Sequence, residues 1–277
     1  MGKTETSQGK EALMPLISVI MGIYNSDEQK LINAVNSVLI QSVSDIELII
    51  CDDGSTKYIN DTLNEICRDS RVKLIRFDEN KGLAAALNAC LDAAKGEYIA
   101  RQDDDDISLA GRFEKQIDFL SKHTEIDFIG TACELYSDGE SVYGQRVMPM
   151  QIDKNSFLFN SPFIHGSMMF KRRVFEKHRY RTLGKNRKYE DYDLFMRLVA
   201  DGYKAANMPE KLYRFFYDTD TRGVPFSMRR DEYKVRMDGF KRLGLMPKGF
   251  LYALKPLALG VLPRKTVMKL KKKTGNV

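Results

Sequence analysis

Residues 97–107 read EYIARQDDDDI, and this stretch decides how the rest of the chain is interpreted. An apolar run through Tyr98 and Ala100 has the pattern of a buried strand, and it stops at four aspartates, Asp103 to Asp106. Four adjacent carboxylates repel one another unless a positive group lies among them. A divalent cation bound with the phosphates of a ligand is one such group, because Mg²⁺ and Mn²⁺ prefer oxygen ligands. The alternative is a solvated acidic loop, or a helix start that Asp106 caps.

Three more buried runs precede this strand, and helical patterns separate them. The expected strands cover residues 16–24, 46–51 and 72–77, and the expected helices follow at 27–39, 58–68 and 83–94. Ser26 and Gln29 resemble a capping box in front of the first helix. Strands and helices in alternation predict an α/β fold, with a Rossmann-like, mostly parallel sheet and helices on both faces.

Polar side chains follow three of these strands. Tyr24 and Asn25 end the first strand, Asp52 and Asp53 end the second, and the aspartates end the fourth. Ligands of parallel sheets bind beyond the carboxyl ends of the strands, so these groups are expected to share one crevice. No G-x-G-x-x-G or G-x-x-x-x-G-K motif follows the first strand, which disfavours dinucleotide and P-loop sites.

The second half of the chain is less regular. Helices are expected at 109–120 and from 190 onward, strands at 126–133, 163–170 and 203–217, and residues 134–160 show no clear period. The polar residues 218–230 are typical of a mobile loop. The apolar, proline-containing residues 243–262 predict short interfacial helices in front of a basic end.

Composition indicates a globular protein of the cytoplasm. Of the 277 residues, 43% are hydrophobic and 30% are charged. The four cysteines lie far apart in apolar segments and are expected to be reduced core residues. The polar N-terminus lacks the apolar core of a signal peptide, and no apolar run has the length of a membrane span. The net charge of +6 is concentrated at residues 264–273, which suggests contact with an anionic surface.

Six motifs in this order resemble family 2 glycosyltransferases of the non-processive kind, which build bacterial surface polysaccharides. The motifs are SVIMGIYN (18–25), ELIICDDGST (47–56), NKGLAAALN (80–88), GEYIARQDDDDI (96–107), HGSMMFKR (165–172) and EDYDLFMRL (190–198). The resemblance covers the chain from Ser18 to about Tyr217. It implies a GT-A fold, a nucleotide-diphosphate sugar donor, and Mn²⁺ or Mg²⁺.

The resemblance also implies roles for single residues at the nucleotide end of the crevice. Gly22 and Tyr24 would contact the base, and Asp53 would accept a hydrogen bond from a ring nitrogen of uracil. Gly22 stands where many members have proline, and Lys57 stands where an aspartate is usual. Neither departure removes a group that the chemistry requires.

The D-x-D motif of the family falls on Asp103 and Asp105. Asp105 would bind the metal that bridges the two phosphates of the donor, and Asp103 or Asp104 would bind ribose. The middle position is itself an aspartate, so the sequence leaves open which two carboxylates act.

Asp191 matches the catalytic base of the family, with Glu190 beside it, and His165 would lie near the donor sugar or the acceptor. The acceptor hydroxyl must lose its proton as it attacks, which requires a carboxylate within reach. A single base opposite the leaving group gives inversion. The alternative for residues 190 and 191 is an ordinary pairing of carboxylates with a helix dipole.

Together these observations predict an inverting, metal-dependent transferase that uses a UDP-sugar in capsule, O-antigen or exopolysaccharide assembly. Its domain would span residues 15–217, with a nucleotide-binding half at 15–107 and an acceptor half at 108–217. A flexible segment (1–14) would precede it, and a mobile loop with a basic helical extension (218–277) would follow. The acceptor would be a saccharide, such as one on polyprenyl diphosphate, and the tail would contact the inner face of the plasma membrane.

Two rival functions remain open at this point. A sugar nucleotidyltransferase would also use aspartates and a metal, but such enzymes usually carry a glycine-rich, basic loop after the first strand. A non-catalytic module that binds sugar nucleotides would share the crevice without the chemistry. Nucleic acid is not expected as a partner, because an acidic crevice repels phosphate backbones.

Overall fold

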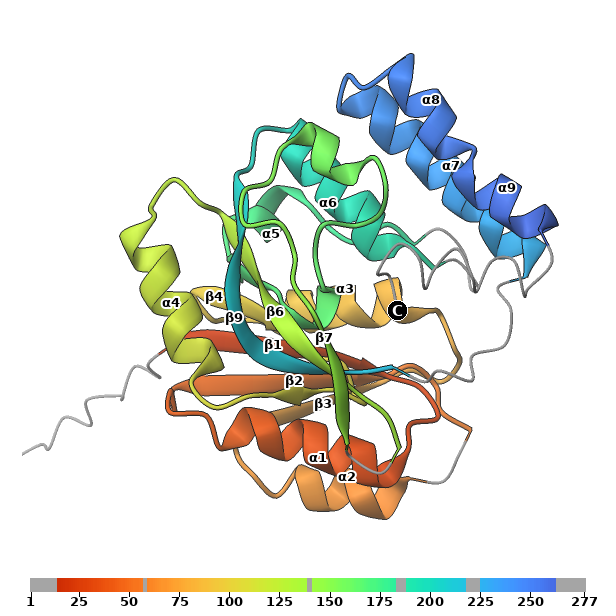
Figure 1. The fold of residues 1–277 in the computed structure, drawn as a ribbon. Helices are drawn as coiled ribbons and strands as arrows, with labels where there is room; N and C mark the ends of the chain where they lie inside the picture. The colour runs from red at the N-terminus through yellow and green to blue at the C-terminus, as the bar shows by residue number, and fades with distance from the viewer. Residues whose placement is uncertain (1–13, 57–58, 139–140, 183–187, 218–224, 263–277) are drawn as a thin grey trace, which may run out of the picture.

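The computed structural model describes residues 14–56, 59–138, 141–182, 188–217 and 225–262 (Figure 1). The first half of the chain alternates strands and helices, as predicted. In order these are β1 (Ile17–Ile23), α1 (Glu28–Leu39), β2 (Ile46–Asp52), α2 (Asn60–Ile66), β3 (Val72–Arg76), α3 (Leu83–Ala93) and β4 (Tyr98–Arg101). β1 pairs in parallel with β2 and β4, and β2 pairs in parallel with β3.

The second half extends this sheet with short and antiparallel strands. Its elements are β5 (Ile107–Ser108), α4 (Arg112–Lys122), β6 (Phe128–Tyr136), β7 (Val142–Arg146), the 3-10 turns η1 (Lys154–Phe157) and η2 (His165–Ser167), β8 (Met169–Lys171), α5 (Val174–Lys177), α6 (Glu190–Ala200) and β9 (Ala205–Phe216). The sheet has the order β3-β2-β1-β4-β8-β6-β9-β5, with β7 on β6. The strand expected at 163–170 is therefore only β8, and η2 precedes it.

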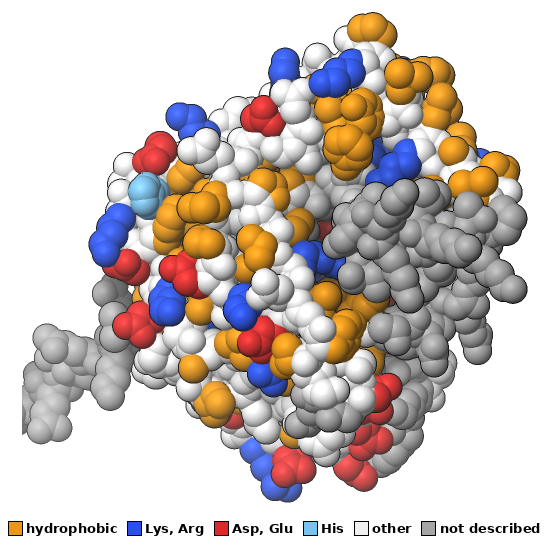
Figure 2. Space-filling model, in the orientation of Figure 1, with side chains coloured by type: hydrophobic (Ala, Val, Ile, Leu, Met, Phe, Trp, Pro, Cys, Tyr) orange, Lys and Arg blue, Asp and Glu red, His pale blue; other side chains and the backbone are white. Residues whose placement is uncertain are grey.

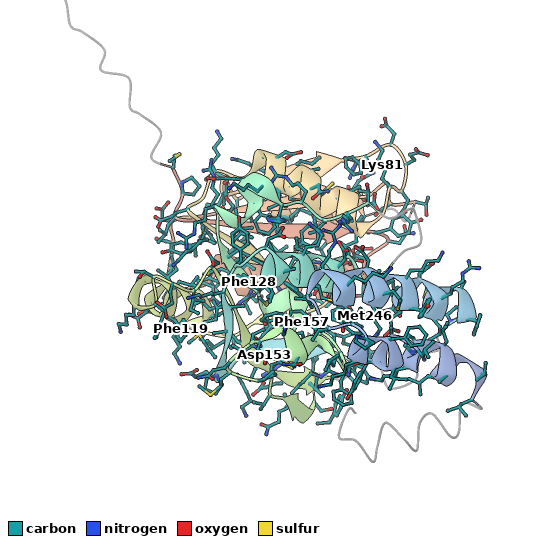
Figure 3. All side chains as sticks on the ribbon, turned by 90° about the horizontal axis from the view of Figure 1, so that it is seen from above. Lys81, Phe119, Phe128, Asp153, Phe157 and Met246 are labelled. Atoms are coloured by element: carbon teal, nitrogen blue, oxygen red, sulfur yellow. The ribbon has the colours of Figure 1, made fainter. Side chains whose placement is uncertain are left out.

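Two hydrophobic cores lie on the two faces of the sheet. One core joins β1 and β2 to α1, α2 and α4, through side chains such as Val35 and Phe113. The other joins the opposite face to α3 and α6, through side chains such as Leu87 and Phe195. Seen from above, Phe128 and Phe157 of this second core lie in the middle of the molecule (Figure 3). The sheet is therefore covered on both faces, as predicted.

The C-terminal part forms a helical extension that packs on α6. It consists of α7 (Phe226–Arg242), α8 (Lys248–Ala253) and α9 (Lys255–Val261), and α8 and α9 run end to end beside α7 (Figure 1). The predicted short helices within residues 243–262 are confirmed. The predicted loop lies partly outside the described residues, at 218–224, and from Phe226 onward that prediction is wrong because α7 begins there. Of the helices that the structure describes, none has the length and apolar character that crossing a bilayer requires.

Two predicted helix caps are wrong. Asp27, not Ser26, caps α1 by accepting a hydrogen bond from the backbone N–H of Lys30. Asp106 does not begin α4; its carboxylate is buried and accepts a hydrogen bond from the backbone N–H of Phe216 at 2.6 Å. The Ser26 hydroxyl instead donates to Asp104, and Asp106 bonds Phe216, so both side chains make long-range contacts that a local cap motif does not reveal.

The cysteine prediction is confirmed for three of the four residues. Cys51, Cys90 and Cys133 are free and buried, whereas Cys67 is free and only partly buried.

Candidate active site

A cleft of about 680 Å³ opens at the carboxyl ends of β1, β2 and β4. Seven of the nine predicted site residues line it, namely Gly22, Tyr24, Asp53, Asp104, His165, Glu190 and Asp191, together with residues such as Leu83 and Met228. Asp103 and Asp105 flank Asp104 in the loop after β4. The sequence argument from polar strand ends therefore located the cleft.

Asp53 shapes the end of the cleft that lies next to α3. It is buried, and its two carboxylate oxygens accept hydrogen bonds from the backbone N–H groups of Lys81 at 2.7 Å and Gly82 at 2.8 Å. Gly82 has a φ of 94°, a conformation that favours glycine. Asp53 therefore fixes the turn that leads into α3, a role that the sequence did not suggest.

Gly22 lets α3 approach β1 closely at the same end. A Cβ atom at this position would lie 2.7 Å from Leu83 Cδ1 and 3.3 Å from Ala86 Cβ. Tyr24, two residues on, is 47% exposed and lines the cleft. Aromatic side chains of this kind suit stacking on a flat base.

Asp53→Ala should lower both stability and donor binding. The substitution leaves two part-buried backbone N–H groups without an acceptor, and because water can partly replace that acceptor the cost is at most about 1–3 kcal/mol each. Thermal unfolding and calorimetric titration with UDP measure the two effects. Asp53→Asn, which keeps one oxygen acceptor, is the matched control and should show a smaller loss. Equal stability of Asp53→Ala and the wild-type protein would contradict the role of this side chain.

The four aspartates after β4 have four different surroundings. Asp103 pairs with the guanidinium of Arg101 at 2.5 Å, and Asp104 accepts a hydrogen bond from the Ser26 hydroxyl. Asp106 is buried against β9, away from the cleft. Burial, and then the charges of Asp103 and Asp104, raise the pKa of Asp105 to about 7. Burial also raises the pKa of Asp106 well above its usual range, but that side chain lies against β9, which leaves Asp105 as the candidate for a cation.

The buried side chains of Arg101 and Arg112 support this loop from the protein interior, and sequence reasoning missed both. Each side chain is no more than 1% exposed. Arg112 donates to the backbone carbonyls of Arg101 and Gly166, at 2.9 and 3.0 Å. Arg101 is the last residue of β4, and only Gln102 separates it from the aspartates. A cation at the end of a buried strand, next to an acidic run, is the sequence feature that could have indicated its role.

A metal ion fits this loop only together with a ligand. Within the part of the chain that the structure describes, no three His, Cys, Asp or Glu side chains are arranged to hold a metal ion. Asp103 is already paired with Arg101, which leaves Asp105 and Asp104 as donors. One or two carboxylates with phosphate oxygens from the substrate are a usual donor set for Mg²⁺.

Asp191 lies in the first turn of α6, at the other side of the cleft. Tyr189 precedes this helix in a left-handed conformation with a φ of 83°. Burial raises the pKa of Asp191 to about 6, while the backbone N–H of Tyr192 opposes this shift. Burial and the charge of Asp191 raise the pKa of Glu190 to about 7. A carboxylate with a pKa near 6 is ionised at neutral pH and is basic enough to accept a proton.

His165 is held by a residue that sequence reasoning also missed. Its Nε2 atom lies 2.9 Å from the hydroxyl of Tyr180. Burial, helped by the charge of Arg101, lowers the pKa of His165 well below its usual range, so the ring is neutral. The amide of Asn88 bonds the backbone N–H and C=O of Tyr180, at 3.0 and 2.8 Å. One indication of such a contact was present in the sequence, namely the polar residue Asn88 at the end of the motif in α3. Its amide is the group that holds Tyr180.

The ligand-free protein should lose stability as the pH rises from about 5 to about 8. The pKa values of Asp105, Glu190 and Asp191 are raised to between about 6 and about 7, above the value of about 4 for unfolded carboxyls. Over this interval the folded chain binds more protons than the unfolded chain, so its free energy of unfolding falls with pH. Melting temperatures at constant ionic strength measure the slope. Asp105→Asn with Glu190→Gln should flatten it, and a rising melting temperature in the wild-type protein would contradict the assignment.

The comparisons with known proteins agree with this geometry. The family model described as Glycosyl transferase family 2 matches residues 18–179. A putative glycosyltransferase of Bacillus subtilis, EpsE, is 36% identical over 263 residues, which cover 94% of both chains. The chain belongs to glycosyl transferase family 2. This transferase is also 32% identical to WfgD of Escherichia coli, a UDP-Glc:alpha-D-GlcNAc-diphosphoundecaprenol beta-1,3-glucosyltransferase, over 67% of this chain and 70% of the relative.

Two further similarities support the fold and the type of reaction. The transferase is 29% identical to an E. coli UDP-Gal:alpha-D-GlcNAc-diphosphoundecaprenol beta-1,3-galactosyltransferase, over 75% of this chain and 76% of the relative. Among solved structures it resembles S. aureus TarS residues 1–349 in complex with UDP-GlcNAc, with a TM-score of 0.66 at 15% identity, over 86% of this chain and 72% of TarS. The curled, mostly parallel sheet with its flanking helices is the GT-A fold. The predicted family and fold are confirmed.

Proposed function

We propose that this transferase moves a sugar from a UDP-sugar to a saccharide on a polyprenyl diphosphate, with inversion at the anomeric carbon. The observation that carries the proposal is that one cleft joins Asp53 and Asp104, at strand ends, to Asp191, at the start of α6. The two E. coli relatives named above use UDP-sugars and a lipid diphosphate acceptor, and their names specify beta linkages. Those names support the same donor and acceptor class here.

The nucleotide is assigned to the end of the cleft that Gly22, Tyr24 and Asp53 form. Each oxygen of Asp53 accepts one backbone hydrogen bond and has a second lone pair for the ring N–H of uracil. Tyr24 offers its ring face to the base. Asp104, or Asp103 through a shift of its pair with Arg101, accepts from ribose hydroxyls.

The reacting atoms are assigned to the other end of the cleft. Asp191 takes the proton of the acceptor hydroxyl as that hydroxyl attacks the anomeric carbon, and Glu190 and His165 contact the sugar or the acceptor. Bound Mn²⁺ or Mg²⁺ would supply Lewis-acid stabilisation of the charge that develops on the leaving diphosphate. Asp105 is the residue that we assign to hold it, with Asp103 or Asp104 beside it.

The physiological setting that we propose is capsule, O-antigen or exopolysaccharide assembly, at the inner face of the plasma membrane. A polyprenyl-linked acceptor requires the enzyme to work at a membrane surface. The free cysteines fit a reducing compartment. The basic residues 264–273, which we expect to contact the anionic leaflet, lie outside the described residues.

Thermal-shift screening of nucleotide sugars tests the proposal, with and without Mn²⁺. A UDP-sugar should raise the melting temperature more with the metal than without it, and the same sugar should then be transferred to a polyprenyl-diphosphate saccharide. Nuclear magnetic resonance of the product should show a beta linkage from an alpha-linked donor. Release of pyrophosphate from a nucleoside triphosphate would favour a nucleotidyltransferase. Donor binding without transfer to any acceptor would favour a binding module.

A further inference from the structure

The outer face of α8 and α9 is apolar, which is unusual for a helix pair at the edge of a protein. The backbone N–H of Leu254 donates to the carbonyl of Phe250, and that of Ala258 to the carbonyl of Leu254, so the helical hydrogen-bond pattern continues from α8 into α9. Large apolar side chains lie exposed along it, and Leu251 and Val261 are 72% and 75% exposed. Figure 2 shows these hydrophobic side chains strung along the outside of the helical extension.

The inner face of the same helices carries small residues. Gly249 packs against Phe240 of α7, where an added Cβ would lie 3.0 Å from the ring, and Gly260 packs against Phe226 at 2.8 Å. Ala253, between them, is fully buried. In an ordinary surface helix the large apolar residues face the core and the polar residues face water. Here the large apolar residues face outward, so burial in the core does not explain them.

The loop after η1 adds the aromatic side chain of Phe159 to this face. Phe159 is 63% exposed, and its ring meets the ring of Tyr252 edge-on at 5.0 Å. The backbone carbonyl of Phe159 accepts hydrogen bonds from Arg236 and Lys255, both at 2.9 Å. The backbone that carries the exposed ring is thus held in place. We call Phe159, Phe250, Leu251, Val261 and Leu262 the apolar ridge.

The described helices α8 and α9 carry only positive charges, although Glu232 of α7 lies near Lys255 and pairs with Arg236. Residues 239–277 contain ten lysines and arginines and no aspartate or glutamate, and Asp238 is the last acid of the chain. Lys248 and Lys255 lie on α8 and α9 themselves. An exposed apolar patch marks an interaction site, and the lysines of α8 and α9 complement an anionic partner. Apolar side chains flanked by lysine are the features that bind a helix in the interface of an anionic bilayer.

We propose that the apolar ridge docks the protein on an anionic lipid bilayer. This inference deepens the proposed function, on which it rests for the location of the acceptor. α7 packs beneath α8 and α9 and also places Met228 in the wall of the cleft. Only α7 therefore separates a bilayer on the ridge from the cleft. A lipid-anchored acceptor must reach that cleft from the bilayer. The surface is folded, and it is distinct from the basic residues beyond Leu262.

Tryptophan fluorescence tests the proposal, because the chain contains no tryptophan. Phe159→Trp and Leu251→Trp each place one reporter on the apolar ridge of the full-length protein. Vesicles of equal parts phosphatidylglycerol and phosphatidylcholine should shift the emission of both to the blue and protect it from iodide. The matched control is Ile40→Trp, which is 81% exposed at the end of α1, on the opposite face of the sheet. Its emission should not change.

A second measurement separates docking from catalysis. Leu251→Ser with Val261→Ser should lower the vesicle-bound fraction in sedimentation by roughly tenfold, whereas Ile40→Ser should not. Transfer to a water-soluble acceptor analogue should be unchanged in both variants. Full vesicle binding by the double variant, or no blue shift at Leu251→Trp, would overturn the proposal. A blue shift that grows with protein concentration without vesicles would also overturn it, in favour of a second copy. A protein that docks through Leu251 but transfers no sugar would instead overturn the proposed function.

Discussion

Asp191→Asn is expected to lower the rate of sugar transfer by about 10²–10⁴-fold, the usual contribution of a positioned general base. Asparagine has nearly the same shape but cannot take a proton from the acceptor hydroxyl. Affinity for the UDP-sugar should stay within a few-fold, because the residues that we assign to the base lie at the ends of β1 and β2, whereas Asp191 lies on α6. Steady-state release of UDP measures the rate, and calorimetric titration measures the affinity.

The control for this substitution lies at the other end of the same helix. Asp201→Asn removes a half-exposed carboxylate beyond the last turn of α6 and should leave the rate unchanged. In the wild-type protein the rate should fall as the pH drops below about 6, because Asp191, with a pKa of about 6, becomes protonated. An Asp191→Asn rate close to that of the wild-type protein would show that another group, such as Glu190, takes the proton.

Asp105→Asn is expected to have opposite effects on stability and on function. Removing a carboxylate whose pKa is raised to about 7 by burial and by Asp103 and Asp104 should stabilise the ligand-free protein at pH 8. The same change should abolish the extra stabilisation that Mn²⁺ gives with a UDP-sugar, and it should lower transfer by at least about a hundredfold, since metal-ion stabilisation is worth several kcal/mol.

Differential scanning fluorimetry with and without Mn²⁺ measures both parts of this prediction. Asp118→Asn, on the exposed side of α4, is the control and should change neither. If Asp105→Asn kept its metal-dependent stabilisation, the metal would have to be assigned to Asp103 and Asp104 instead.

The first half of the fold was predictable because three of its four strands, β1, β2 and β4, are buried on both faces. Runs such as Ile46–Asp52 are buried at every position and mainly apolar, so their position and their parallel pairing follow from the sequence. The second half was harder because β5 and β8 have only two and three residues. Strands this short depend on their neighbours in the sheet and leave no periodic pattern. The helix α7 was mistaken for a loop at its start because its first turns are polar and pair within the helix, as Glu232 does with Arg236.

The candidate site was predictable wherever a functional group ends a strand or begins a helix. Asp53, Asp104 and Asp191 meet in one cleft for that reason. Arg112 and Tyr180 were missed because their importance lies in contacts with residues distant in the chain. Arg101 pairs with Asp103, only two residues away, but the sequence does not show that its side chain is buried. The same limit explains Ser26, whose hydroxyl bonds Asp104, a residue 78 positions away, although a cap three residues away looked sufficient.

The double use of Asp53 has a consequence for how this transferase can diverge. Its carboxylate closes the turn at Lys81 and Gly82, and it is also the group that we assign to the base. A substitution that adapts this position to another nucleotide would loosen the entry to α3 at the same time. The cleft walls around His165 and Met228 are not assigned to the base, so a substitution there does not affect base binding and the turn before α3 together. Descendants of this chain should therefore acquire new sugars and acceptors more readily than a new nucleotide.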